Sequence, residues 1–193
     1  MAISVAVAVG DIADELIDKI HKKASSLVVA PWTDEKSDMG PVISSEHKKK
    51  IEDYISKGLD EGATLLCGGP GKPEGFENGW FVKPTIFKDV TNDMKIAKEE
   101  IFGPVLVIIP FKDEDEAIEI ANDTPYGLAA YLQTGSEERA KRVAAKLRAG
   151  AIHINGGEFN YGSPFGGYKQ SGNGREGGIM GLEDYLESKT LHY

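Results

Sequence analysis

The sequence has little of what three common classes of protein require. Cys67 is its only cysteine, so no intrachain disulfide can form, and we expect a cytoplasmic protein. Lys and Arg total 22 against 31 Asp and Glu, and the resulting net charge of -9 argues against binding to nucleic acid. The apolar run over residues 3–9 is too short to cross a bilayer, so we expect no membrane partner.

The residues that most often bind metals or act as nucleophiles are also scarce. The four histidines, His21, His47, His153 and His192, show no metal-ligand spacing, so no metal site is expected. Cys67 ends a predicted strand and is followed by two glycines, with no cationic neighbour or helix start to activate it. We therefore interpret Cys67 as an inert structural thiol.

Apolar stretches alternate with helical patterns along most of the chain. Strands are expected over residues 3–9, 63–67, 80–87, 103–110, 128–133 and 151–155, and helices over 12–23, 45–61, 113–122 and 136–148. This alternation predicts an α/β fold with a mostly parallel sheet and flanking helices. Pro84 predicts an edge strand at 80–87, and the continuous apolar run at 103–110 predicts a strand covered on both faces.

No internal repeat or linker interrupts this pattern. We expect one α/β domain over residues 1–178 and a C-terminal tail over residues 179–193. Within the tail, residues 186–192 alternate between apolar and polar side chains, which is typical of an edge strand. An unpaired edge strand is a docking site for another chain.

Residues 99–104 read Glu-Glu-Ile-Phe-Gly-Pro and place two carboxylates directly before a predicted buried strand. One carboxylate can accept hydrogen bonds from both hydroxyls of a ribose, and an aromatic ring beside it limits where a flat ligand can lie. Taken alone, the stretch fits a charged lead into a strand, with Phe102 in the core, more simply than it fits a binding site.

Further motifs follow in order over nearly the whole chain. They are Asp-Met-Gly-Pro at 38–41, Asn-Asp-Thr-Pro-Tyr-Gly-Leu at 122–128, His-Ile-Asn-Gly at 153–156, Pro-Phe-Gly-Gly-Tyr-Lys-Gln-Ser-Gly at 164–172, Gly-Arg-Glu at 174–176, Gly-Leu at 181–182 and Glu-Ser-Lys at 187–189. Together with residues 99–104, this series resembles the NAD(P)-dependent aldehyde dehydrogenase superfamily. The resemblance implies a catalytic-domain fragment that begins just after the family's nucleophilic cysteine.

The resemblance implies an oxidoreductase that oxidises an aldehyde to a carboxylic acid with NAD or NADP, through a cysteine thiohemiacetal. The nucleophile and the cofactor domain would lie outside this chain. We therefore expect the chain alone to be inactive and to bind the cofactor weakly or not at all. The alternative is a non-enzymatic remnant, or a module of a split protein, that serves oligomerisation.

The resemblance also assigns roles to single residues. Glu100 would bind the nicotinamide ribose and Phe102 would pack beside the nicotinamide. Phe159 and Phe165 would line the substrate tunnel. Glu176 matches a position that relays protons or binds a structural monovalent cation, with a buried, salt-bridged carboxylate as the alternative.

The C-terminal motifs imply contact with a second subunit. By resemblance, Arg175 and Glu187 brace the interface, and we expect the two side chains to lie within hydrogen-bonding distance. The strand at 186–192 would join the oligomerisation sheet, so a homo-oligomer is expected. The glycine-rich loop at 162–178 could instead cradle a phosphate, but it lacks both common phosphate-loop patterns, so we do not predict such a site.

Overall fold

The computed structural model describes residues 5–9, 12–76 and 78–193. The backbone forms two compact units, Met1–Asp113 and Glu114–Tyr193, which are described separately below. Both contain helices and strands, so the predicted α/β class is confirmed. Residues 3 and 4 of the first predicted strand lie outside the described residues.

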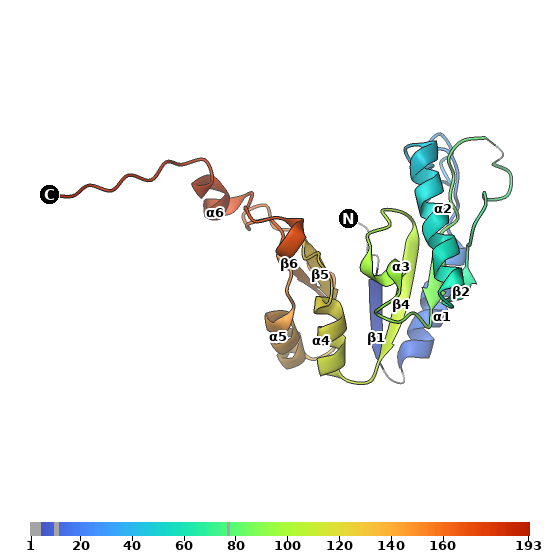
Figure 1. Ribbon diagram of the computed structural model, residues 1–193, viewed down its shortest axis with the longest axis horizontal. Helices are drawn as coiled ribbons and strands as arrows, with labels where there is room; N and C mark the ends of the chain where they lie inside the picture. Colours follow the sequence, from blue (N-terminus) through green and yellow to red (C-terminus); the bar gives the residue numbers. More distant parts are fainter. Residues whose placement is uncertain (1–4, 10–11, 77) are drawn as a thin grey trace. The chain divides into compact units, whose positions relative to one another are not determined.

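The first unit contains a four-stranded sheet (Figure 1). Its elements are β1 (Val5–Val9), α1 (Ile12–Ser25), α2 (Ser45–Asp60), β2 (Thr64–Cys67), β3 (Thr85–Lys88), α3 (Lys95–Lys98) and β4 (Val105–Phe111). The strand order is β1-β4-β3-β2. Strand β4 runs parallel to both β1 and β3, so that Val107 pairs with Val5 on one side and Phe87 on the other. Strand β2 runs antiparallel to β3.

Helices cover β3 and β4 on both faces, as the apolar run of β4 predicts. Ile86 and Ile108 pack against apolar residues of α1, among them Ile17 and Ile20. On the other face, Phe87 lies fully buried close to Gly58 of α2. Helix α2 begins at the predicted residue, Ser45, and Ser44 is its cap.

The strand predicted at 80–87 differs from the observed one in length and position. It begins only at Thr85, and it lies between β2 and β4 rather than at an edge, so the edge prediction is wrong. The physical reason is that Pro84 precedes the strand, and its missing N–H is therefore outside the ladder. Thr85 supplies the first bond, from its N–H to the carbonyl oxygen of Pro104 at 2.8 Å.

The second unit contains a two-stranded parallel sheet. Its elements are α4 (Glu114–Asn122), β5 (Ala129–Leu132), α5 (Glu137–Lys146), β6 (Ala151–Ile154), a 3-10 turn (Lys169–Ser171) and α6 (Gly178–Glu183). Helix α5 is the crossover that parallel strands require. Ser136 caps α5 by accepting a hydrogen bond from the N–H of Arg139, as the predicted start at 136 implies.

Residues 186–193 have no regular secondary structure in this single chain. The strand predicted at 186–192 is therefore not formed here, because a strand needs a neighbouring strand to bond its backbone. Its place in an oligomer, and the predicted boundary between residues 178 and 179, stay predictions. No helix in the described part of the chain is both long and apolar enough to cross a membrane.

Candidate cofactor-facing site

Residues 99–104 connect α3 to β4 without regular secondary structure. Ile101 is buried, with 1% of its surface exposed, and anchors the stretch in the core. Its two neighbours point outward: Glu100 is exposed and Phe102 is 65% exposed. The interpretation of Phe102 as a core residue is therefore wrong, and the carboxylate and the aromatic ring are both open to a ligand.

The backbone of this stretch is unusual at two adjacent positions. Phe102 has φ of 60°, in the left-handed region, which costs a residue with a side chain roughly 1–3 kcal/mol. At Gly103, an added Cβ would lie 2.7 Å from two side-chain carbons of Ile51, which is itself fully buried. The glycine is therefore required by close packing against α2.

Side chains on one face of α2 form hydrogen bonds with residues 99, 100 and 102. The Nε2 atom of His47 lies 2.7 Å from the carbonyl oxygen of Phe102, and Lys50 donates to the carbonyl oxygen of Glu100 at 3.2 Å. The hydroxyl of Tyr54 donates to the Glu99 carboxylate at 2.5 Å. Positions 47, 50 and 54 share one helix face because they are three and four residues apart.

These contacts were not predicted from the sequence. The spacing of His47, Lys50 and Tyr54 on a predicted helix was visible, but the partner segment, about fifty residues away, was not. Beside this face lies an open pocket of about 500 Å³, whose lining includes Lys50, Lys57, Lys95 and Tyr54. Two acidic residues, Glu46 and Asp53, also line this pocket, so its four lysines exceed its acidic residues by two, although the chain as a whole is acidic.

The predicted tunnel residues lie together in the second unit. The ring centroids of Phe159 and Phe165 are 5.9 Å apart in an edge-to-face arrangement, and Phe159 is 47% exposed. Two backbone hydrogen bonds of 2.6 Å join Phe165 to Glu176. Glu176 is exposed and forms no ion pair within the described residues, so the buried, salt-bridged alternative is wrong. Its catalytic role stays a prediction.

Arg175 does not pair with Glu187 in this chain. Its guanidinium donates to the carbonyl oxygens of Gly167 and Gly174, at 3.1 and 2.8 Å, and lies over the ring of Tyr168. Neither a hydrogen bond nor an ion pair joins Arg175 to Glu187 in the part of the chain that the structure describes. Both loop carbonyls are bonded by the Nη1 atom of Arg175, and Glu187 lies in the irregular tail. Their interface role stays a prediction.

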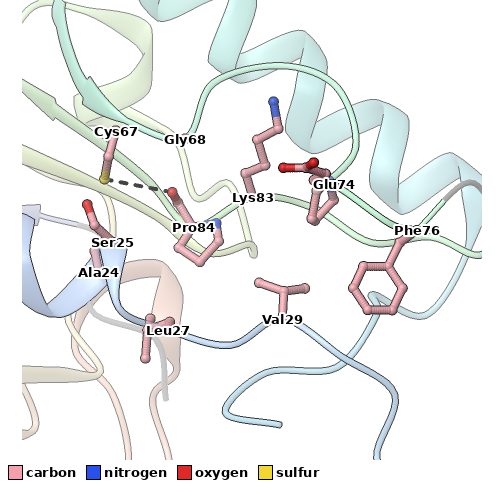
Figure 2. A pocket seen from close by; sticks show the side chains of 11 residues that line it. Ala24, Ser25, Leu27, Val29, Cys67, Gly68, Glu74, Phe76, Lys83 and Pro84 are labelled. Carbon is pink, nitrogen blue, oxygen red and sulfur yellow. Dashed lines mark hydrogen bonds between the residues drawn. The ribbon is translucent and has the colours of Figure 1, made fainter. Parts of the chain in front are cut away.

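Cys67 lies in the first unit, in a pocket whose lining includes neither Glu100 nor Phe102 (Figure 2). It lines an open pocket of about 340 Å³, and its sulfur is 3.9 Å from the carbonyl oxygen of Pro84. Lys83 lines the same pocket, but its ammonium group bonds the carbonyl oxygen of Pro70 at 3.2 Å. This half-buried thiol thus has no cationic partner among the described residues. The same residues contain no cluster of His, Cys, Asp and Glu that could hold a metal ion.

Comparison with known proteins decides the family. The sequence profile of the aldehyde dehydrogenase family matches residues 1–191. The chain belongs to this family. A 3-succinoylsemialdehyde-pyridine dehydrogenase from a Pseudomonas species is 49% identical over 178 residues, which are 92% of this chain and 37% of that relative.

Solved aldehyde dehydrogenases share the fold of this chain. Aldehyde dehydrogenase C from Pseudomonas syringae, a variant in complex with NAD⁺ and octanal, has a TM-score of 0.93 and 42% identity. The match covers 96% of this chain and 38% of the Pseudomonas syringae protein. An aldehyde dehydrogenase from Mycobacterium tuberculosis in complex with NAD⁺ has a TM-score of 0.90 and 46% identity, over 94% and 38% of the two chains. The chain thus spans little more than a third of the length of these relatives.

Proposed function

We propose that this chain is part of an oxidoreductase that oxidises an aldehyde to a carboxylic acid with NAD or NADP. The observation that carries the proposal is the outward pair Glu100 and Phe102 on either side of the buried Ile101. Two similar solved proteins are complexes with NAD⁺, and one of them also holds octanal, an aldehyde. A cytoplasmic location fits the single free thiol.

The exposed groups at residues 100 and 102 fit one end of a nicotinamide dinucleotide. An ionised carboxylate accepts hydrogen bonds only, and the two hydroxyls of a ribose are donors that suit it. The exposed ring of Phe102 offers an apolar edge beside that carboxylate, which restricts where the nicotinamide can lie. When bound, the dinucleotide supplies the electron acceptor for the oxidation. The role of this chain is to orient it.

The 193-residue chain alone is proposed not to catalyse the reaction. Thiohemiacetal chemistry needs a thiolate poised at the substrate carbonyl. Cys67, the only cysteine, contacts the carbonyl oxygen of Pro84 and has no adjacent cation among the described residues. Contacts from Glu100 and Phe102 would have to offset an association cost of ~4–15 kcal/mol, so we expect NAD to bind only at millimolar concentration or more weakly.

The second unit is proposed to supply one wall of the substrate tunnel and a subunit interface. Phe159 and Phe165 form an aromatic cluster that suits the wall of an apolar tunnel, and Glu176 is tied to Phe165 through the backbone. The proposed partner is a second copy of the subunit, held through Arg175, Glu187 and the tail at 179–193.

One observation favours the second candidate function, an oligomerisation module without activity. Many large apolar side chains after residue 178 are exposed: Ile179, Met180, Leu182, Tyr185, Leu186 and Leu191. Exposed apolar surface of this kind marks contact sites. Light scattering at micromolar concentration tests it, and a clean monomer would contradict it.

Titration with NAD, followed by NMR, tests the cofactor-facing assignment. In the unmodified chain, millimolar NAD should perturb the signals of residues 99–103. Glu100→Gln keeps the shape of the side chain but removes its charge, and should suppress these changes. Glu99→Gln is the matched control, because it alters the neighbouring carboxylate, which accepts a hydrogen bond from Tyr54. This variant should keep the signal changes that NAD causes. Perturbations that lie elsewhere, or that survive Glu100→Gln, would contradict the assignment.

A further inference from the structure

The backbone at residues 100–102 is held mainly by side chains of α2. Before this stretch, the N–H of Glu99 donates to the carbonyl oxygen of Lys95. After it, the carbonyl oxygen of Gly103 accepts a hydrogen bond from the N–H of Val105. Between these points, the carbonyl oxygens of Glu100 and Phe102 are bonded by the side chains of Lys50 and His47. Within the described residues, no sheet or helix ladder fixes the peptide planes that direct the two exposed side chains.

Phe102 needs such a restraint more than its neighbours do. Its left-handed backbone is disfavoured for a residue with a Cβ, so the chain would relax to negative φ without an opposing contact. The exposed ring of Phe102 provides little packing to hold this conformation. The hydrogen bond from His47, at 2.7 Å, is made directly to the Phe102 carbonyl group.

His47 is itself well placed to act as a fixed support. It lies in the first turn of α2, where its own N–H donates to the hydroxyl of the cap residue Ser44 at 3.1 Å. Ile51 and Ile55 anchor the helix in the core. Because its partner is a carbonyl oxygen, the Nε2 atom of His47 must carry the hydrogen.

We propose that His47 is a positioning residue that holds Phe102 in its left-handed conformation and so sets the direction of the cofactor-facing pair Glu100 and Phe102. The importance of this for catalysis rests on the proposed function. Loss of the hydrogen bond turns the Phe102 peptide plane and changes the directions in which the two side chains point.

The test is an NMR measurement on the 193-residue chain without cofactor. In the unmodified chain, we expect a coupling across the hydrogen bond between ¹⁵Nε2 of His47 and the carbonyl ¹³C of Phe102. The three-bond coupling between Hα of Phe102 and the carbonyl ¹³C of Ile101 should report its positive φ, because these two atoms are anti to each other only in that conformation. His47→Ala should abolish the first coupling and raise the population of the relaxed conformer by roughly two- to twelvefold, the range expected for one lost hydrogen bond.

Two further variants separate positioning from general support of the helix. His47→Gln keeps an N–H donor on a side chain of similar reach and should restore most of the Phe102 coupling. Lys49→Ala alters the same helix at an exposed residue paired with Asp53, and should leave Phe102 unchanged. If His47→Ala does not fold, the proposal is still tested by the coupling across the hydrogen bond in the unmodified chain and by the Phe102 coupling in His47→Gln.

Absence of the trans-hydrogen-bond coupling in the unmodified chain would overturn the proposal. So would equal Phe102 couplings in His47→Ala and Lys49→Ala, or failure of His47→Gln to restore them. Because no NAD is present, these outcomes are distinct from failure of the cofactor assignment, which the Glu100→Gln titration addresses separately.

Discussion

The unit Met1–Asp113 contains nearly all of the buried apolar residues that the structure describes, whereas Glu114–Tyr193 contains three, Ile118, Ala140 and Val143. In the first unit, helices cover the central strands on both faces, and the proposed cofactor-facing stretch at residues 99–104 is anchored to that core through Ile101. The predicted tunnel and interface residues lie in the second unit, where little apolar surface is buried. The proposed cofactor-facing residues of the first unit are therefore supported more firmly by this chain alone than the proposed tunnel and interface residues of the second unit.

Polar contacts at the surface partly replace a core in the second unit. Arg142 donates two hydrogen bonds to the Glu114 carboxylate, both at 2.8 Å, and Lys146 lies 3.1 Å from Asp115. The hydrogen bonds from Arg142 lower the pKa of Glu114, and the nearby positive charges add to this effect. Exposed ion pairs contribute little stability each, so we expect the second unit to open more readily than the first.

The largest expected effect comes from removing the centre of the first core. Phe87→Ala should lower the free energy of unfolding by about 3–5 kcal/mol, because this fully buried ring leaves a cavity that its neighbours cannot fill. The matched change in the second unit is Phe159→Ala, which removes a half-exposed ring and should cost only about 0.5–1.5 kcal/mol. Urea unfolding measures both, and equal losses would contradict the contrast between the units.

A smaller effect is expected where the cofactor-facing stretch packs on α2. Gly103→Ala should cost about 1–3 kcal/mol, because the new methyl group would lie 2.7 Å from buried Ile51. Gly40→Ala is the control, because an added Cβ at Gly40 has no atom within 4 Å. That change should alter stability by no more than about 0.5 kcal/mol. Thermal unfolding that ranks the two variants equally would show that the stretch is not tightly packed.

The smallest expected effect is a loss of stability of the second unit in acid. The folded-state pKa of Glu114 is lowered, so the pair with Arg142 stabilises the unit above the ordinary glutamate value of 4.5 and is lost as pH falls through the folded-state pKa. Glu114→Gln should flatten this acid dependence of the melting temperature, and high salt should weaken it. Glu137→Gln, at an exposed carboxylate on α5, is the control. An unchanged acid profile in Glu114→Gln would argue against the pair.

Local sequence signals predicted the elements that depend on neighbouring residues. Helix α2 begins at the predicted residue 45, the predicted start at 136 is the cap of α5, and the apolar run at 103–110 marks a strand buried on both faces. Pro84 misled the prediction because its effect depends on whether it lies inside the ladder or just before it, which only the register of β3 shows.

The candidate site was predicted only through its motif. The resemblance assigns cofactor binding to Glu100 and Phe102, and both side chains are exposed in this chain, while their role stays a prediction. The positive φ of Phe102 and its bond to His47 depend on packing between segments far apart in sequence, so no local pattern could show them. The tail at 186–192 has the alternation of a strand, but its pairing depends on a partner strand that this chain does not provide in the structure.

The measurement that tests the account most directly is an assay of the chain alone with aldehydes. Purified protein is incubated with NAD or NADP and a panel of short aliphatic and aromatic aldehydes, and the absorbance of the reduced nicotinamide is followed. We predict no turnover, because the only thiol, Cys67, lies in a pocket that none of the predicted site residues line. Turnover that survives repurification and disappears in Cys67→Ser would contradict the account, since it would make Cys67 the nucleophile.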